Sequence, residues 1–96
     1  MPKVPSVHNK PFMVVKPHQP EPKYFKTFPL ARASLMKDID WFIDTWQGLC
    51  LQDSVTACIL VKEDAAGLNG PGSVSGVIDP YTGLKYTAEI VERPKL

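Results

Sequence analysis

Residues 34–50, SLMKDIDWFIDTWQGLC, carry the clearest periodic pattern in the chain. Their apolar side chains recur at intervals of four, three, four and three residues, the spacing that places them on one face of an α-helix. Ser34 is a suitable N-cap and Gly48 a suitable terminator. The pattern therefore predicts one amphipathic helix over about residues 34–48, whose apolar face packs on a core. The side chains of that face are Leu35, Ile39, Phe42, Trp46 and Leu49.

Trp41 lies outside this apolar face. At the helical period it points into the polar side, near Lys37 and Thr45. Tryptophan favours contacts in which one edge of the ring stays in water, and it is enriched among interface hot spots. We expect Trp41 to contact another chain or the N-terminal segment of its own chain, with simple exposure as the alternative.

Three acidic residues of the same helix, Asp38, Asp40 and Asp44, raise the question of a metal or acid–base site. They occupy different angles around the helix, so one ligand could not reach all of them. We interpret them as a solvated polar face.

The segment after the helix has two interpretations. Residues 55–62, VTACILVK, are rich in β-branched side chains, which favours a strand. In the alternative, Ser54 caps a helix that runs to Ala66 and ends at Gly67. The strand is the preferred prediction, and the alternative stays open.

The C-terminal part predicts a β-hairpin. Its strands are expected at residues 73–78 and 84–92, joined by Asp-Pro-Tyr-Thr-Gly at residues 79–83. Proline suits the second position of a type I turn, and glycine can take the positive φ that closes the hairpin. Alternate residues of the second strand, Leu84, Tyr86, Ala88 and Ile90, are expected to face the helix.

Residues 1–32 differ from the rest in composition. They hold seven prolines and no glycine, and six basic residues against one acid give them a charge of about +5. Residues 33–96 carry five basic and nine acidic residues. We therefore divide the chain into an extended, basic, proline-rich arm (1–32) and a small α+β body (33–96), with the helix packed on an antiparallel sheet.

The arm is too apolar for a typical disordered tail. One interpretation folds it back, so that residues 12–15 add a strand to the chain's own sheet. Another lays it across a neighbouring subunit, and disorder is the third. The residues predicted to contact a partner are Phe12, Val14, Tyr24, Phe25, Phe28 and Trp41.

Cysteine usage and hydropathy indicate a soluble, intracellular chain or one within an assembled particle. Its longest apolar runs are far shorter than a signal peptide or a membrane span. We expect Cys50 and Cys58 to be free, buried thiols.

These observations predict a non-catalytic assembly subunit that docks onto a larger, virion-like or other multi-subunit complex through its arm and Trp41. The expected partners are other protein subunits, in a homo- or hetero-oligomer, with no cofactor and no membrane. One alternative is a small nucleic-acid-binding accessory protein, although its lysines are widely spaced. A second alternative is a thiol- or metal-dependent enzyme subunit, although His8 and His18 have no cysteine or carboxylate at ligand spacing.

Overall fold

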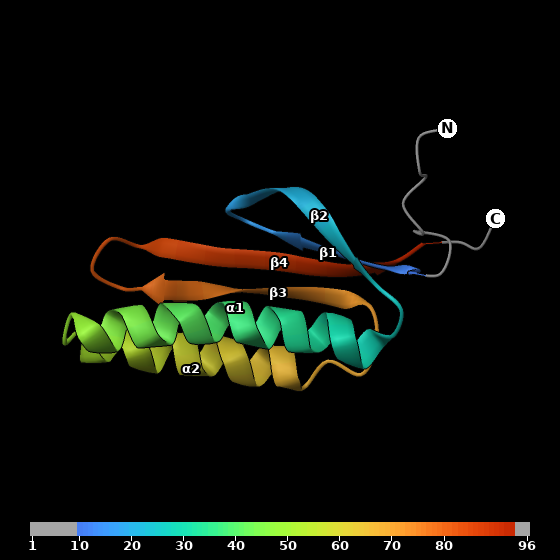
Figure 1. The fold of residues 1–96 in the computed structure, drawn as a ribbon. Helices are drawn as coiled ribbons and strands as arrows, with labels where there is room; N and C mark the ends of the chain where they lie inside the picture. Colours follow the sequence, from blue (N-terminus) through green and yellow to red (C-terminus); the bar gives the residue numbers. More distant parts are fainter. Residues whose placement is uncertain (1–9, 94–96) are drawn as a thin grey trace.

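A computed structural model describes residues 10–93 of the chain. Two helices cover one face of a four-stranded sheet (Figure 1). The sheet is antiparallel throughout, with strand order β2-β1-β4-β3. The predicted α+β class and the C-terminal hairpin are confirmed. In chain order the elements are β1 (Phe12–Lys16), β2 (Gln19–Phe25), α1 (Phe28–Gly48), α2 (Gln52–Ala66), β3 (Gly72–Asp79) and β4 (Leu84–Glu92).

The described part of the N-terminal segment belongs to the sheet. β1 lies between β2 and β4, and Val14 is paired with Ile90 of β4. Of the three interpretations of the arm, the one in which residues 12–15 join the chain's own sheet describes this arrangement. Val14 explains it physically, because the side chain is only 1% exposed in the core between sheet and helices. Residues 1–9 of the predicted arm lie outside the described residues.

Helix α1 confirms the predicted amphipathic helix but begins earlier, at Phe28. Thr27 is the N-cap, and its hydroxyl accepts a hydrogen bond from the Leu30 backbone N–H at 3.4 Å. Pro29 lies in the first turn, where the missing N–H would have had no helical partner. Residues 28–32 are therefore helix rather than arm, and Ser34 is not the cap.

The predicted strand at residues 55–62 is wrong, because this segment lies within helix α2. Val55, Cys58 and Val61 recur at helical spacing and are buried, and Cys58 and Val61 belong to the core between the sheet and the helices. The helical cost of a β-branched side chain is only tenths of a kcal/mol, less than the roughly 1.5–3 kcal/mol that full burial of such a side chain contributes. The alternative helix ending before Gly67 is the one observed, but Ser54 is buried rather than a cap.

A tight turn joins the two helices. Leu51 donates to the Trp46 carbonyl and Cys50 donates to the Gln47 carbonyl, both at 3.0 Å, the pattern of a Schellman motif. Cys50 takes the left-handed position of that motif with φ 60°, where glycine is usual. Because α1 ends at Gly48, Leu49 is 60% exposed instead of continuing the apolar face as predicted.

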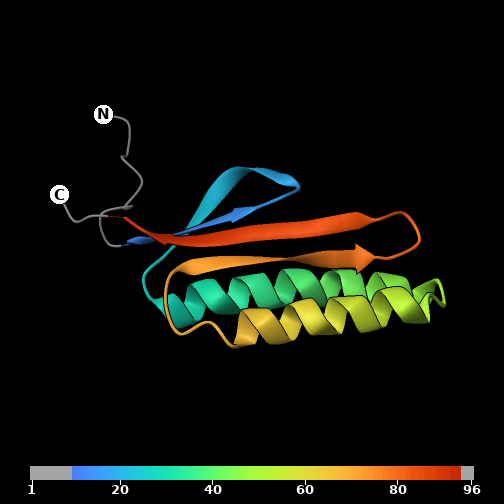
Figure 2. The same ribbon diagram turned by 180° about the vertical axis from the view of Figure 1, so that it is seen from behind.

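The core lies between the helices and the sheet (Figure 2). Leu35 and Ile39 of α1 face Tyr86, Ala88 and Ile90 of β4, and all five are buried. The predicted inward face of the last strand is thus confirmed except at Leu84, which is 46% exposed near the hairpin turn. Across residues 10–93, neither helix combines the length and apolar content needed to cross a membrane.

Candidate binding groove beside a buried aspartate

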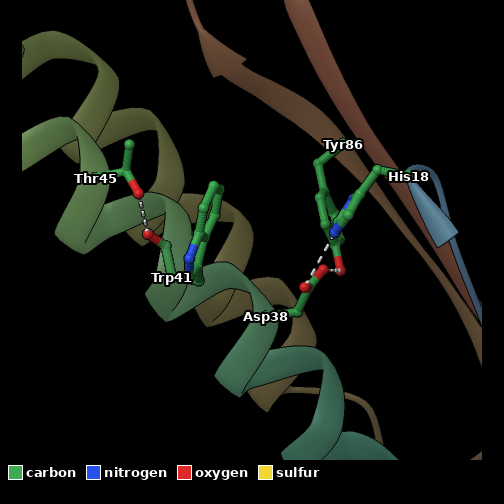
Figure 3. A network of polar contacts seen from close by, with 5 residues as sticks. All are labelled: His18, Asp38, Trp41, Thr45 and Tyr86. Carbon is green, nitrogen blue, oxygen red and sulfur yellow. Dashed lines mark hydrogen bonds and ion pairs between the residues drawn. The ribbon is translucent and has the colours of Figure 1, made fainter.

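Asp38 is the centre of a polar cluster between α1 and the sheet. Its side chain is only 10% exposed. The Tyr86 hydroxyl donates to one carboxylate oxygen at 2.7 Å, and His18 Nε2 lies 3.3 Å from the other (Figure 3). The interpretation of Asp38 as part of a solvated face is therefore wrong. The reason is tertiary, because His18 at the β1–β2 turn lies against this side of α1.

The cluster keeps its tyrosine protonated. Burial, followed by the hydrogen bond to Asp38 and the charge of that carboxylate, raises the pKa of Tyr86 far above its ordinary value. The phenol therefore remains a donor at any physiological pH. It orients Asp38 rather than offering a proton for chemistry.

Lys16 lines the same hollow as Asp38, and the charge of that carboxylate acts on it. The residue is only 7% exposed, unusual for a lysine. Burial lowers the pKa of Lys16, the Asp38 carboxylate opposes that shift, and Lys23 adds to it. The fold thus disfavours the charged form of Lys16, and a further negative charge in the hollow would favour that form.

Two adjoining hollows form a groove between β2 and α1, which we call the β2–α1 groove. Their volumes are about 240 and 350 Å³, and Lys23, Ser34 and Lys37 line both. The smaller hollow is also lined by Lys16, Gln19, Asp38 and Trp41, and the larger by Phe25, Leu30 and Ala33.

The two ends of the β2–α1 groove differ in chemistry. Lys23 and Lys37 are common to both ends; one end adds Lys16 and Trp41, whereas the other adds Phe25 and Leu30, which is 52% exposed. The arrangement fits an extended ligand that is acidic at one end and apolar at the other.

Trp41 borders the basic end of the groove and is 60% exposed. Its ring contacts Phe42 edge-on, with 5.0 Å between the ring centroids. Thr45 donates a 2.8 Å hydrogen bond to the Trp41 carbonyl one turn along α1 (Figure 3). Across the hollow lie Lys16 and Gln19, so Trp41 faces residues of the predicted arm.

The other residues predicted to contact a partner are less accessible. Val14 is buried in the core and is not available to a partner. Phe12 and Phe28 pack edge-on against each other, with 6.1 Å between centroids, and lie against the core. Tyr24 lies under the Arg93 guanidinium, 4.5 Å from the ring centroid. Only Phe25 and Trp41 of the predicted set line the groove.

The cysteines lie away from this groove. Cys58 is free and buried as predicted, and burial raises the pKa of its thiol despite an opposing interaction with Trp46. Its sulfur lies 3.5 Å from the Ile78 carbonyl, which suits packing better than nucleophilic attack. Cys50 is free but exposed, contrary to the expectation that it is buried. Residues 10–93 contain no group of three His, Cys, Asp or Glu side chains that could hold a metal ion.

Sequence reasoning missed the residues that build the site around Asp38. One signal was present at Tyr86, an inward-facing tyrosine whose hydroxyl needs a partner when buried. The sequence does not identify that partner, because Asp38 is 48 positions away from Tyr86. Searches with this chain against protein-family models, curated proteins and solved structures found no match.

Proposed function

We propose that this chain is a non-catalytic assembly subunit that binds an acidic, partly apolar segment of a partner protein in the β2–α1 groove. The observation that carries the proposal is the meeting of three lysines and an exposed tryptophan in a groove whose other end adds the apolar side chains of Phe25 and Leu30. The docking surface thus retains Trp41 and Phe25 from the predicted contacts. In this proposal the partner binds in the groove, whereas the sequence predicted that a free arm makes the contact.

Charge favours an acidic ligand. Asp38 already accepts a hydrogen bond from Tyr86 and lies beside His18 and Lys16, so its charge is largely engaged within the protein. The ammonium groups of the lysines that line the hollow have fewer oppositely charged partners than Asp38 has. A partner carboxylate would therefore gain charge-assisted hydrogen bonds in a partly desolvated place.

Apolar contact favours a protein ligand. Trp41 and Leu30 together expose large apolar side chains at the two ends of one groove. Burying such anchors supplies most of the binding energy in protein interfaces, and tryptophan is prominent among them. An apolar side chain of the partner can occupy the end lined by Phe25 and Leu30.

Nucleic acid is the second candidate, and one observation favours it. An exposed indole beside three lysines resembles the combination of stacking platform and phosphate contacts that single strands use. The larger hollow also presents Lys23 and Lys37, which could contact phosphates. The candidate is weaker because the rest of that lining, Phe25, Leu30 and Ala33, suits an apolar side chain of a protein better than a phosphate backbone.

Trp41 fluorescence tests the proposal on the full chain. In a Trp46→Phe background Trp41 is the only indole. The probe is the peptide acetyl-Glu-Glu-Asp-Leu-Leu-amide, with acetyl-Lys-Lys-Lys-Leu-Leu-amide as its charge-reversed match. We expect a saturable change of Trp41 emission with the acidic peptide alone. The double variant Lys23→Glu/Lys37→Glu should abolish it, whereas Lys85→Glu, on an exposed residue outside the groove, should not.

An oligothymidine titration separates the two candidates. The groove would be a nucleic-acid site if the oligonucleotide binds and the acidic peptide does not. In that case the affinity for the oligonucleotide should fall by roughly an order of magnitude between low and physiological salt. No response to either ligand at low salt would contradict the proposal.

A further inference from the structure

The sheet has an open edge at β3. Among residues 10–93, β3 pairs only with β4, so half of its backbone N–H and C=O groups face away from the sheet. From Gly72 to Ile78 the strand contains neither proline nor a charged residue. A strand edge of this kind is a template for pairing with another extended segment.

The opposite edge, β2, is closed to such pairing. Pro20 and Pro22 lie two residues apart, so their backbone nitrogens point to the same side of the strand, and neither has an N–H to donate. Glu21 and Lys23 add charge to the same short strand. Protection of one edge and not the other makes β3 the place where a further strand can be added.

Helix α2 supplies a flank beside the open edge. The Lys62–Asp40 ion pair, with a nitrogen–oxygen distance of 2.7 Å, identifies the side of α2 that faces α1. By the helical period, Ala57 and Leu60 lie on the other side. Because α2 packs mainly on β3 and α1 on the remaining strands, this flank lies along the β3 edge (Figure 2). Leu60 is 59% exposed there.

The charges of this flank all have one sign. Asp53 and Asp64 lie on the same side of α2 as Leu60, towards the two ends of the helix. The Tyr81 hydroxyl donates to Asp53 at 3.0 Å and holds that carboxylate beside the β3–β4 turn. This flank, residues 67–71 and β3 contain no lysine or arginine of their own, and the cation beside them is Arg32 of α1, which donates to the Leu68 carbonyl at 2.9 Å.

From the open strand, the apolar Leu60 and the two carboxylates we infer that β3 binds an extended segment of a partner protein as a fifth strand. Backbone hydrogen bonds to β3 supply the register. Asp53 and Asp64 favour basic residues in that segment, on either side of an apolar residue that contacts Leu60. The site lies at the opposite edge of the sheet from the β2–α1 groove, so the two can be occupied together.

Amide hydrogen exchange of the full chain tests this inference. The probe is the peptide acetyl-Lys-Thr-Val-Thr-Val-Thr-Lys-amide. We expect exchange to slow at alternate amides of Gly72–Asp79 and to stay unchanged in β2. Leu60→Asp should weaken peptide binding about tenfold, a loss of about 1.4 kcal/mol. The matched control is Ile59→Asp, because Ile59 is also exposed but lies on the side of Lys62.

Three results would overturn the inference. The first is equal binding of a peptide in which both lysines are replaced by glutamate, and the second is equal binding of one with proline at the central threonine. The third is a change of molar mass in light scattering between the parent chain and Leu60→Asp without peptide, because it would show that a second copy covers the edge.

Discussion

The two sides of this small protein are packed in opposite ways. Where α2 meets β3, small residues let the elements approach closely: a Cβ added at Gly76 would lie 2.8 Å from Val61 Cγ2. Where α1 meets β2, long polar side chains border hollows of about 240 and 350 Å³. Side-chain size accounts for the difference. Close packing between α2 and β3 stabilises the fold, whereas the wider space between α1 and β2 leaves room for a ligand.

The closely packed side can be broken at Gly76. Gly76→Ala should destabilise the fold by about 1–3 kcal/mol, because the new methyl group overpacks against Val61. Urea unfolding followed by circular dichroism measures the loss. Gly48→Ala is the control, since a Cβ there meets nothing within 4 Å, and it should leave stability equal or higher. Equal stability of the two variants would show that the contact at Gly76 is not tight.

The polar cluster on the wider side is tested by Tyr86→Phe. The change removes the donor to Asp38 and leaves a buried carboxylate with one partner fewer. We expect a loss of about 1–2 kcal/mol in the free energy of unfolding. The double variant Tyr86→Phe/Asp38→Leu should recover part of that loss, because no carboxylate then remains to be satisfied. A double variant less stable than Tyr86→Phe alone would contradict this account.

The turn that links the two sides offers a smaller, stabilising change. Cys50→Gly should raise stability by about 0.5–1 kcal/mol, since glycine takes φ 60° without the steric cost of a side chain. Thermal unfolding under reducing conditions measures the gain. Cys50→Ala is the comparison and should leave stability nearly unchanged, because alanine keeps the Cβ.

Lys16→Met is expected to have the smallest effect on stability and thereby separates binding from folding. Burial lowers the pKa of Lys16, which means that the folded state disfavours its charged form, so removing the charge should not destabilise the fold. Affinity for the acidic probe of the β2–α1 groove should nevertheless fall. If Lys16→Met lowers the free energy of unfolding and leaves the affinity for the acidic probe unchanged, Lys16 serves the structure and not the ligand.

Local patterns predicted the elements whose signals were complete within a short window. The spacing of Leu35, Ile39 and Phe42 indicates the amphipathic part of α1, and the alternation at Tyr86, Ala88 and Ile90 indicates the inward face of β4. Local patterns gave the wrong prediction for α2, because its β-branched residues favour a strand locally. Burial of Cys58 and Val61 in the core between the helices and the sheet decides for the helix.

By itself the amino-acid sequence determined the α+β class, most of α1, the C-terminal hairpin and the position of Trp41 outside the apolar face, because these depend on residues within a few turns or strand positions of one another. Only the tertiary structure decided that residues 12–25 enter the sheet, that Asp38 is enclosed by Tyr86 and His18, and that β2 and α1 border a groove. Those features join segments many residues apart, and the free energy that selects them comes from burial and pairing across the whole core, which no local window contains.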